Sequence, residues 1–204
     1  MRLIAERLIG GRGGETLFSG IDFSLGPGAA LIVTGPNGSG KSTLLRTIAG
    51  LLPLEAGTLR LEGAGDNWPS AAAACHYLGH LNGMKTALTV TENLQFWRLF
   101  LGEPRLAVDA ALDRVGLGGI GHLPFGYLSA GQRRRAAIAR LLISHRPVWL
   151  LDEPTAGLDA RSDQEFVALM REHLDTGGIV IATTHQALGI DGANGLDLAS
   201  MTHA

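Results

Sequence analysis

The segment Gly35–Ser42, GPNGSGKS, has the residue types and spacing that bind a chain of phosphates. It matches G-x-x-x-x-G-K-[ST] between an apolar run and an amphipathic run, the strand–loop–helix context that the motif requires. Glycines allow successive N–H groups to face one anion, and the following helix adds its positive end. We therefore predict a nucleotide-binding loop, against the alternative of a glycine-rich turn without a ligand. The residues assigned to the nucleotide are Gly35, Pro36, Asn37, Gly38, Ser39, Gly40, Lys41, Ser42 and Thr43.

Two acids, Asp152 and Glu153, follow an apolar run at 148–151. Carboxylates at the carboxyl end of a parallel strand lie where open α/β sheets bind ligands. Lys41 would then reach the β- and γ-phosphates, while Ser42 and Asp152 would hold Mg²⁺, Asp152 through water. Glu153 would polarise the attacking water as general base. The alternative is a strand that ends in two solvated acids.

The segment 128–132, LSAGQ, offers a second anion-binding position. Ser129 and the backbone around Gly131 provide donors at the predicted start of a helix over 132–143. Three arginines follow at 133–135. Because consecutive helical positions point in different directions, packing or solvation explains these arginines at least as well as phosphate contact does.

The order of the apolar runs indicates an α/β fold that positions these segments. Strands are predicted at 3–8, 21–25, 30–34, 58–61, 77–79, 148–151 and 179–183, with a loop at 10–15. Helices are predicted at 42–51, 93–101, 106–115, 132–143 and 162–174, with Thr91, Pro104 and Ser129 near three of the helix starts. Strands that alternate with helices favour a mostly parallel core sheet with helices on both faces. We expect one domain, 1–204, with a core of about 1–88 and 144–204 and a helical subdomain of about 89–143.

Composition and charge exclude several classes of protein. The chain has 204 residues, 46% of them hydrophobic and 18% charged, which fits one folded domain. Its net charge of −2 gives no electrostatic reason to expect a nucleic-acid partner. The single cysteine cannot form an internal disulfide, and no Cys/His cluster has zinc-ligand spacing, which favours a cytosolic compartment. No apolar run approaches the ~20 residues of a membrane span, so a membrane role would come through a partner.

The motifs together resemble those of ATP-binding-cassette (ABC) ATPases over nearly the whole chain. LSAGQ is similar to their LSGGQ signature, with Ala130 at a glycine position. The resemblance implies a P-loop NTPase fold, an N-terminal antiparallel β region, and ATP and Mg²⁺ as cofactors. It also implies a head-to-tail dimer, in which Ser129, Gly131 and Gln132 of one copy close over the ATP held by the other.

The resemblance assigns roles to two further residues. Asp159, in the PTAGLD segment after Glu153, would lie along the dimer seam, although a turn that caps the next helix explains it about as well. His185 would contact the γ-phosphate and orient Glu153 and the water. Its alternative is an ordinary loop histidine after a strand.

Three departures separate this chain from the general ABC pattern. His80, in YLGH at 77–80, stands where a glutamine usually senses the γ-phosphate; a shifted loop with an idle histidine is the alternative. The N-terminal loop lacks the aromatic residue that stacks on adenine, so Arg12 would stack there or be solvated. The segment 121–127 lacks the acidic motif of drug exporters. With TTHQ at 183–186 and a short segment after it, these details resemble the ATP-binding subunits of haem exporters in c-type cytochrome maturation.

This resemblance implies an ATP-hydrolysing subunit of a bacterial inner-membrane complex. The subunit would lie at the cytoplasmic face, bind integral membrane subunits and energise haem handling. The main alternative is the ATPase of another ABC transporter with a different substrate. A soluble ABC switch is the second alternative, and a single cassette without insertions and a net charge of −2 argue against it.

Overall fold

The computed structural model describes residues 1–184 and 188–201, and the chain forms two compact units. Unit 1 comprises Met1–Gly79, Pro147–Pro154 and Met170–Ala204, and unit 2 comprises His80–Arg146 and Thr155–Leu169. The predicted division into a core and a helical subdomain over 89–143 stays a prediction.

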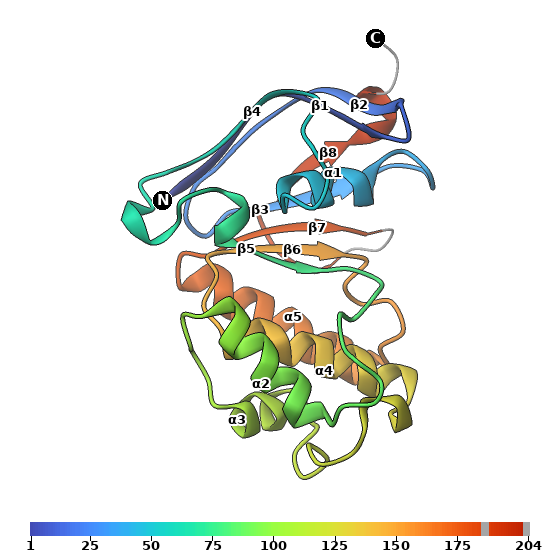
Figure 1. Cartoon of the computed structure of the whole chain (residues 1–204). Coiled ribbons are helices and arrows are strands. Elements are labelled where there is room, and N and C mark those ends of the chain that lie inside the picture. Colours follow the sequence, from blue (N-terminus) through green and yellow to red (C-terminus); the bar gives the residue numbers. More distant parts are fainter. Residues whose placement is uncertain (185–187, 202–204) are drawn as a thin grey trace. The chain divides into compact units, whose positions relative to one another are not determined.

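Unit 1 contains two sheets (Figure 1). A three-stranded antiparallel sheet has the order β2-β1-β4, with β1 at Arg2–Arg12, β2 at Glu15–Leu25 and β4 at Ala56–Glu62. A five-stranded parallel sheet has the order β5-β6-β7-β3-β8, with β3 at Ala30–Thr34, β5 at Cys75–Leu78, β6 at Val148–Asp152, β7 at Ile179–Thr183 and β8 at Asn194–Asp197. The predictions of a parallel core sheet and an N-terminal antiparallel region are confirmed. The sequence pattern did not predict β8.

Strands β1 and β2 form one long hairpin, so the predicted loop over 10–15 is wrong. Gly13 and Gly14 have φ angles of 65° and 86°, and they form a two-residue turn between paired Arg12 and Glu15. Two consecutive residues with positive φ angles match the right-handed twist of a hairpin, and glycine adopts such angles without steric strain. The pairing therefore continues to the turn.

Strand β6 is buried along its whole length because helices cover both of its faces. Val148 and Leu150 point into a core that includes Leu44, Leu45 and Ile48 of helix α1, Lys41–Ile48. Trp149 points the other way, and its ring stacks on that of His173, near the end of helix α5, Ala160–Asp175, at 4.1 Å. The side-chain alternation of one strand thus confirms the expected helices on both faces of the sheet.

Unit 2 is mostly helical. Helices α2, Val90–Leu101, α3, Val108–Arg114, and α4, Ala130–Ile143, pack against one another, and the first turns of α5 belong to the same unit. Thr89 caps α2, with Glu92 completing a capping box, so the predicted cap at Thr91 is wrong. Glu92 lies three residues after Thr89, where its carboxylate can accept a hydrogen bond from the Thr89 backbone N–H. Thr89 is therefore the residue that caps the helix. Pro104 does not open α3 and instead lies beside Ser144 in an isolated bridge.

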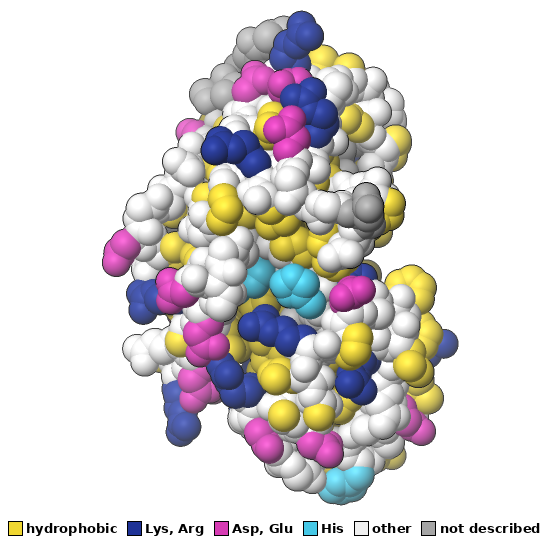
Figure 2. Space-filling model, turned by 90° about the vertical axis from the view of Figure 1, so that its left-hand side faces the viewer, with side chains coloured by type: hydrophobic (Ala, Val, Ile, Leu, Met, Phe, Trp, Pro, Cys, Tyr) yellow, Lys and Arg dark blue, Asp and Glu magenta, His cyan; other side chains and the backbone are white. Residues whose placement is uncertain are grey.

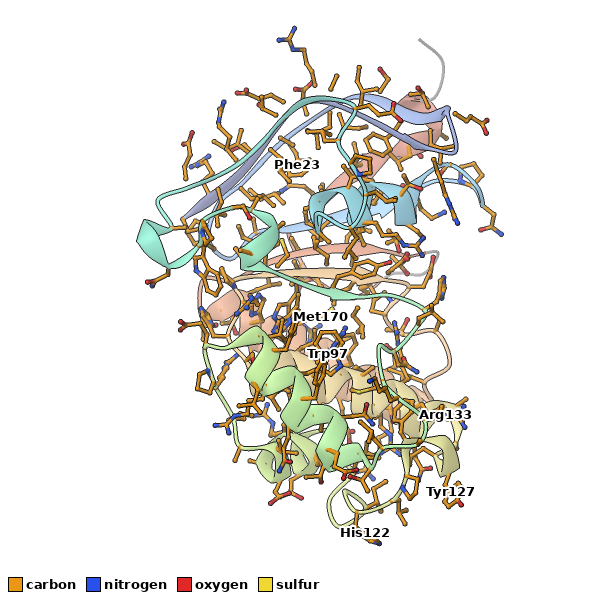
Figure 3. All side chains as sticks on the ribbon, viewed as in Figure 1. Phe23, Trp97, His122, Tyr127, Arg133 and Met170 are labelled. Atoms are coloured by element: carbon orange, nitrogen blue, oxygen red, sulfur yellow. The ribbon has the colours of Figure 1, made fainter. Side chains whose placement is uncertain are left out.

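Arginines of α4 hold the loops and helices of unit 2 together. Arg133 Nη2 donates to the Gly126 carbonyl oxygen at 2.6 Å, and Arg135 Nη1 donates to that of Gly116 at 2.9 Å. Figure 3 shows Trp97 on α2, and the guanidinium of Arg140 lies 4.6 Å from its ring centroid. Burial lowers the pKa of Arg140 to about 10. These contacts favour the packing interpretation of arginines 133 and 135.

The outer surface mixes charges with a few exposed apolar side chains. Acidic and basic side chains are intermingled on the face drawn in Figure 2. Three apolar side chains of α2 are exposed, namely Phe96 at 52%, Leu99 at 85% and Phe100 at 70%. Among residues 1–184 and 188–201, no helix is both long and apolar enough to cross a bilayer.

Candidate nucleotide site

The predicted phosphate loop connects β3 to α1 and bends through glycines with positive φ. Gly35, Gly38 and Gly40 have φ angles of 141°, 85° and 90°. A Cβ on Gly35 would lie 2.7 Å from Ser39 Oγ, so a larger residue would close the loop. Gly40 precedes α1 without a side-chain cap. The first N–H groups of α1 are therefore left to a ligand or to water.

Lys41 lies folded against the same loop. Its Nζ donates to the carbonyl oxygens of Gly35 at 2.8 Å and Pro36 at 2.9 Å, and its side chain is buried. Nearby, the buried Ser39 Oγ has no hydrogen-bond partner among the described residues. A buried ammonium, an unused hydroxyl and open helix N–H groups are complementary to an anion such as a phosphate chain.

The carboxylate of Asp152 gathers hydroxyl groups from three other elements. Ser42 Oγ of α1 and Thr183 Oγ1 of β7 each donate to Asp152 Oδ1 at 2.9 Å. The Tyr77 hydroxyl of β5 donates to Asp152 Oδ2 at 3.1 Å. Asp152 is only 1% exposed, so these donors compensate for the water that its charge has lost. The sequence predicted Ser42 and Asp152 together, and the structure brings them into contact.

Sequence reasoning missed Tyr77, Thr183 and Arg46 as parts of this network. Arg46 Nε donates to the Tyr77 hydroxyl at 3.1 Å, and this bond raises the pKa of Arg46. Burial raises the pKa of Tyr77. Thr183 lies beside Asp152 because β7 pairs with β6 in that register, and the sequence pattern does not contain the register.

Glu153 follows β6 in a left-handed conformation, with a φ of 46°. Its backbone N–H donates to Thr183 Oγ1 at 3.0 Å, which ties the bend to β7. The bend ends the side-chain alternation of the strand, so Glu153 is half-buried beside a fully buried Asp152. A non-glycine residue in this region costs of order 1–3 kcal/mol and is concentrated at functional sites.

The LSAGQ segment forms the start of α4 in unit 2. Ser129 Oγ accepts from the Gln132 N–H at 3.2 Å, and Gln132 Oε1 accepts from the Ser129 N–H at 2.9 Å. The prediction of Ser129 as a helix cap is confirmed. A Cβ on Gly131 would lie 3.6 Å from the Gly157 carbonyl oxygen, so LSAGQ and the PTAGLD segment are neighbours in unit 2.

Asp159 caps helix α5, as the alternative interpretation of this residue predicted. Its Oδ1 accepts from the Ser162 N–H at 2.8 Å at the start of α5. This hydrogen bond lowers the pKa of the Asp159 carboxyl. A place for Asp159 along a dimer seam stays a prediction.

The other predicted residues are not brought into the Asp152 network. His80 is exposed at the first position of unit 2. Arg12 is exposed at the end of the β1–β2 hairpin in unit 1. Leu17 of that hairpin lies close to Gly40, since a Cβ on Gly40 would be 3.0 Å from Leu17 Cβ. The hairpin is therefore beside the phosphate loop, while His185 lies outside the described residues.

The oxygen atoms of Ser42 and Asp152 fit Mg²⁺, which prefers hard oxygen ligands and binds through few protein groups. Among the described residues, no three His, Cys, Asp or Glu side chains gather into a metal-binding cluster.

Known proteins share both the fold and the motifs of this chain. A family model described as "ABC transporter" matches residues 18–156. The chain therefore belongs to the ABC transporter family, as an ATP-hydrolysing cassette, and its relatives place it in the cytochrome c biogenesis branch. A protein of Mesorhizobium japonicum named cytochrome c biogenesis ATP-binding export protein CcmA is 67% identical over 193 residues, which cover 95% of this chain and 96% of that protein. A protein of the same name from Chelativorans sp. is 64% identical over 200 residues, which cover 98% and 99%.

Solved structures share the fold at lower identity. A putative ABC transporter ATP-binding protein from Pyrococcus furiosus has a TM-score of 0.82 and 22% identity, and the match covers 99% of this chain and 100% of that one. A bacterial Atm1-family ABC exporter with ATP bound has a TM-score of 0.78 and 25% identity, with 96% of this chain and 36% of that one covered. These matches confirm the predicted cassette fold.

Proposed function

We propose that ATP hydrolysis by this chain energises haem export for the biogenesis of c-type cytochromes. The catalytic part rests on one observation, the convergence of Ser42 and Asp152 at the sheet edge where Lys41 and Glu153 also lie. The biological part rests on relatives that are 60–67% identical and carry the cytochrome c biogenesis name.

ATP binds through its phosphates at the start of α1. Lys41 exchanges the carbonyl oxygens of Gly35 and Pro36 for phosphate oxygens, and the open N–H groups of the loop donate to the same chain. Ser42 and Asp152 hold Mg²⁺, which when bound neutralises phosphate charge. Arg12 lies on a hairpin that flanks the loop, and its guanidinium plane stacks on the adenine.

Glu153 acts as general base for the attacking water. Its left-handed backbone and the link of its N–H to Thr183 fix the point at which its side chain leaves the backbone after β6. In this proposal Glu153 accepts a proton as the water attacks the γ-phosphate. His185 orients the water and Glu153, and His80 senses the γ-phosphate from the segment that follows β5.

Two copies complete each site in a head-to-tail dimer. The capping box engages the N–H groups of Ser129 and Gln132, and those of Ala130 and Gly131 point out of the first turn of α4. Ser129 and Ala130 are exposed, as a surface that meets a second molecule must be. The signature of one copy then covers the γ-phosphate on the other, and Asp159 lies along the seam. Hydrolysis removes these γ-phosphate contacts and releases the dimer.

Integral membrane subunits bind this chain at the cytoplasmic face of the inner membrane. The family description and the relatives' name both refer to transport. The exposed apolar side chains of α2, Phe96, Leu99 and Phe100, provide a surface for such partners. A Mg²⁺-ATP cycle in the cassette would then move the membrane subunits.

Deletion of the gene tests the biological role. We expect loss of covalently attached haem from c-type cytochromes, measured by haem staining of denatured membrane proteins, while b-type cytochromes keep their spectra. The wild-type gene should restore the staining, and a Lys41→Ala variant expressed at the same level should not. Normal c-type cytochromes in the deletion strain would contradict the proposal.

A further inference from the structure

Helix α1 holds both oxygens of the Asp152 carboxylate. Ser42 and Arg46 are four residues apart and so lie on one face of α1. Ser42 Oγ donates directly to Oδ1 at 2.9 Å. Arg46 reaches Oδ2 through Tyr77, with 3.1 Å from Arg46 Nε to the hydroxyl and 3.1 Å from the hydroxyl to Oδ2.

The donor inventory fixes the direction of this relay. A guanidinium N–H only donates, so the Tyr77 oxygen must accept from Arg46. The single hydroxyl proton of Tyr77 is then committed to Asp152, whose carboxylate accepts it. Thr183 is committed in the same way, because its oxygen accepts from the Glu153 N–H while its proton goes to Asp152 Oδ1. The rotation of the carboxylate is thus set from both sides.

The chain makes room for the Tyr77 ring. A Cβ on Gly79 would lie 2.8 Å from Cε1 and from the hydroxyl oxygen of Tyr77, so the ring lies over the glycine backbone. On β5, His76 and Leu78 are buried on one face of the sheet, and Tyr77 packs on the other against the core that contains α1. Strand register and a glycine two residues later together aim the hydroxyl at Asp152.

We propose that Tyr77, held by Arg46, is a positioning residue that orients the Asp152 carboxylate for Mg²⁺. The proposal rests on the proposed function, in which Asp152 binds Mg²⁺. The Tyr77 bond fixes Oδ2, which leaves Oδ1 directed at Ser42, the other group that would hold the ion. Without the hydroxyl, the carboxylate loses one of its donors in a place that is only 1% exposed, and its orientation is held less firmly.

Tyr77→Phe in the full chain tests this role, because it keeps the ring and removes the hydroxyl. Calorimetric titration gives the affinity for ATP in EDTA and the Mg²⁺ concentration at half of the Mg²⁺-dependent gain in that affinity. We expect the EDTA affinity to change less than twofold and the Mg²⁺ midpoint to rise about tenfold, the equivalent of one hydrogen bond to a charged group. Arg46→Met should raise the midpoint about threefold, since the hydroxyl stays but is no longer directed.

The matched control is Tyr127→Phe, because the chain has two tyrosines and Tyr127 is 83% exposed. Its Mg²⁺ midpoint should equal that of the wild type. Asp152→Asn separates the positioning role of Tyr77 from the assignment of Asp152 to Mg²⁺. If Asp152→Asn shifts the midpoint and Tyr77→Phe does not, the positioning role is overturned while the metal assignment stands. If neither variant shifts it, both fail.

Thermal unfolding distinguishes positioning from a purely structural role. A lower melting temperature of Tyr77→Phe with an unchanged Mg²⁺ midpoint would overturn the proposal. Should Tyr77→Phe not fold, Arg46→Met decides in the same titration, and an unchanged midpoint there would overturn the proposal as well.

Discussion

Helices α1 and α4 both begin in segments that the sequence assigns to the nucleotide, yet their first turns are built differently. Helix α1 follows Gly40, which has a φ of 90° and offers no side-chain cap. Helix α4 follows Ser129, which forms a complete capping box with Gln132. The start of α1 therefore leaves its donors to a ligand, whereas the start of α4 satisfies two of its donors itself.

This difference assigns ATP binding to the start of α1 and closure of the proposed dimer to the start of α4. If phosphates complete the first turn of α1 as proposed, most of the affinity for ATP should belong to unit 1. The first turn of α4 is ordered by its own side chains and adds only the N–H groups that remain. A lone copy should therefore bind ATP but hydrolyse it slowly, until a second α4 covers the γ-phosphate.

The largest effect is expected from Glu153→Gln, which keeps both helix starts and removes the base. Turnover should fall by about 10²- to 10⁴-fold, since a general base contributes that much. ATP should remain bound and trap a dimer, measured by phosphate release and by light scattering with ATP. Glu165→Gln, at a half-buried glutamate of α5 whose carboxylate pairs with Arg161, is the matched control and should behave as wild type. Hydrolysis by Glu153→Gln at the normal rate would refute the base assignment.

Lys41→Ala tests whether the start of α1 binds the phosphates. ATP affinity should fall by about 10- to 100-fold, because charge-assisted hydrogen bonds contribute about 1.5–3 kcal/mol. Equilibrium binding of ATP measures the change. Lys85→Ala, at the only other lysine, is the control and should keep full affinity. Equal affinities in both variants would show that Lys41 does not reach the phosphates.

Ser129→Ala tests whether the start of α4 serves turnover as well as the stability of the helix. The free energy of unfolding should fall by about 1 kcal/mol as the cap is lost, and turnover should fall about tenfold while monomer affinity for ATP is unchanged. Thr89→Ala removes the matching capping box of α2 and should lower stability by a similar amount without a change in turnover. If the two variants lose the same turnover, Ser129 acts only as a helix cap.

His80→Ala tests a residue that belongs to neither helix start. Turnover should fall about fivefold, the equivalent of one hydrogen bond of about 1 kcal/mol, with ATP binding intact. Steady-state hydrolysis and equilibrium binding separate the two quantities. Full activity would leave His80 as an exposed loop residue.

Local patterns predicted the parts of the fold that local interactions decide. Strands at 30–34 and 179–183 match to the residue, because short apolar runs between turns have one way to be buried in a parallel sheet. The cap at Thr89 was missed because two threonines stood two residues apart, and only the reach of Glu92 decides between them. Strand β8, NGLD, has one buried residue and so gives no apolar run to detect.

The candidate site shows the same limit. The phosphate loop and the acids after β6 are contiguous motifs, and their backbone context can be deduced from neighbouring residues. The network around Asp152 joins Arg46, Tyr77 and Thr183, which are far apart in the sequence. Their contact depends on strand register and on the face of α1 that turns toward β5, and no local pattern contains either.

The left-handed backbone at Glu153 has a consequence for how this position tolerates substitution. A glycine would adopt a φ of 46° without strain and would relieve about 1–3 kcal/mol, and asparagine would fit better than most residues. Selection for stability alone would thus favour replacing Glu153, and the replacement would abolish the proposed role of its carboxylate as general base. Stabilised variants of this protein obtained without selection for activity should therefore accumulate changes at this residue, and a β-branched side chain should be absent among them.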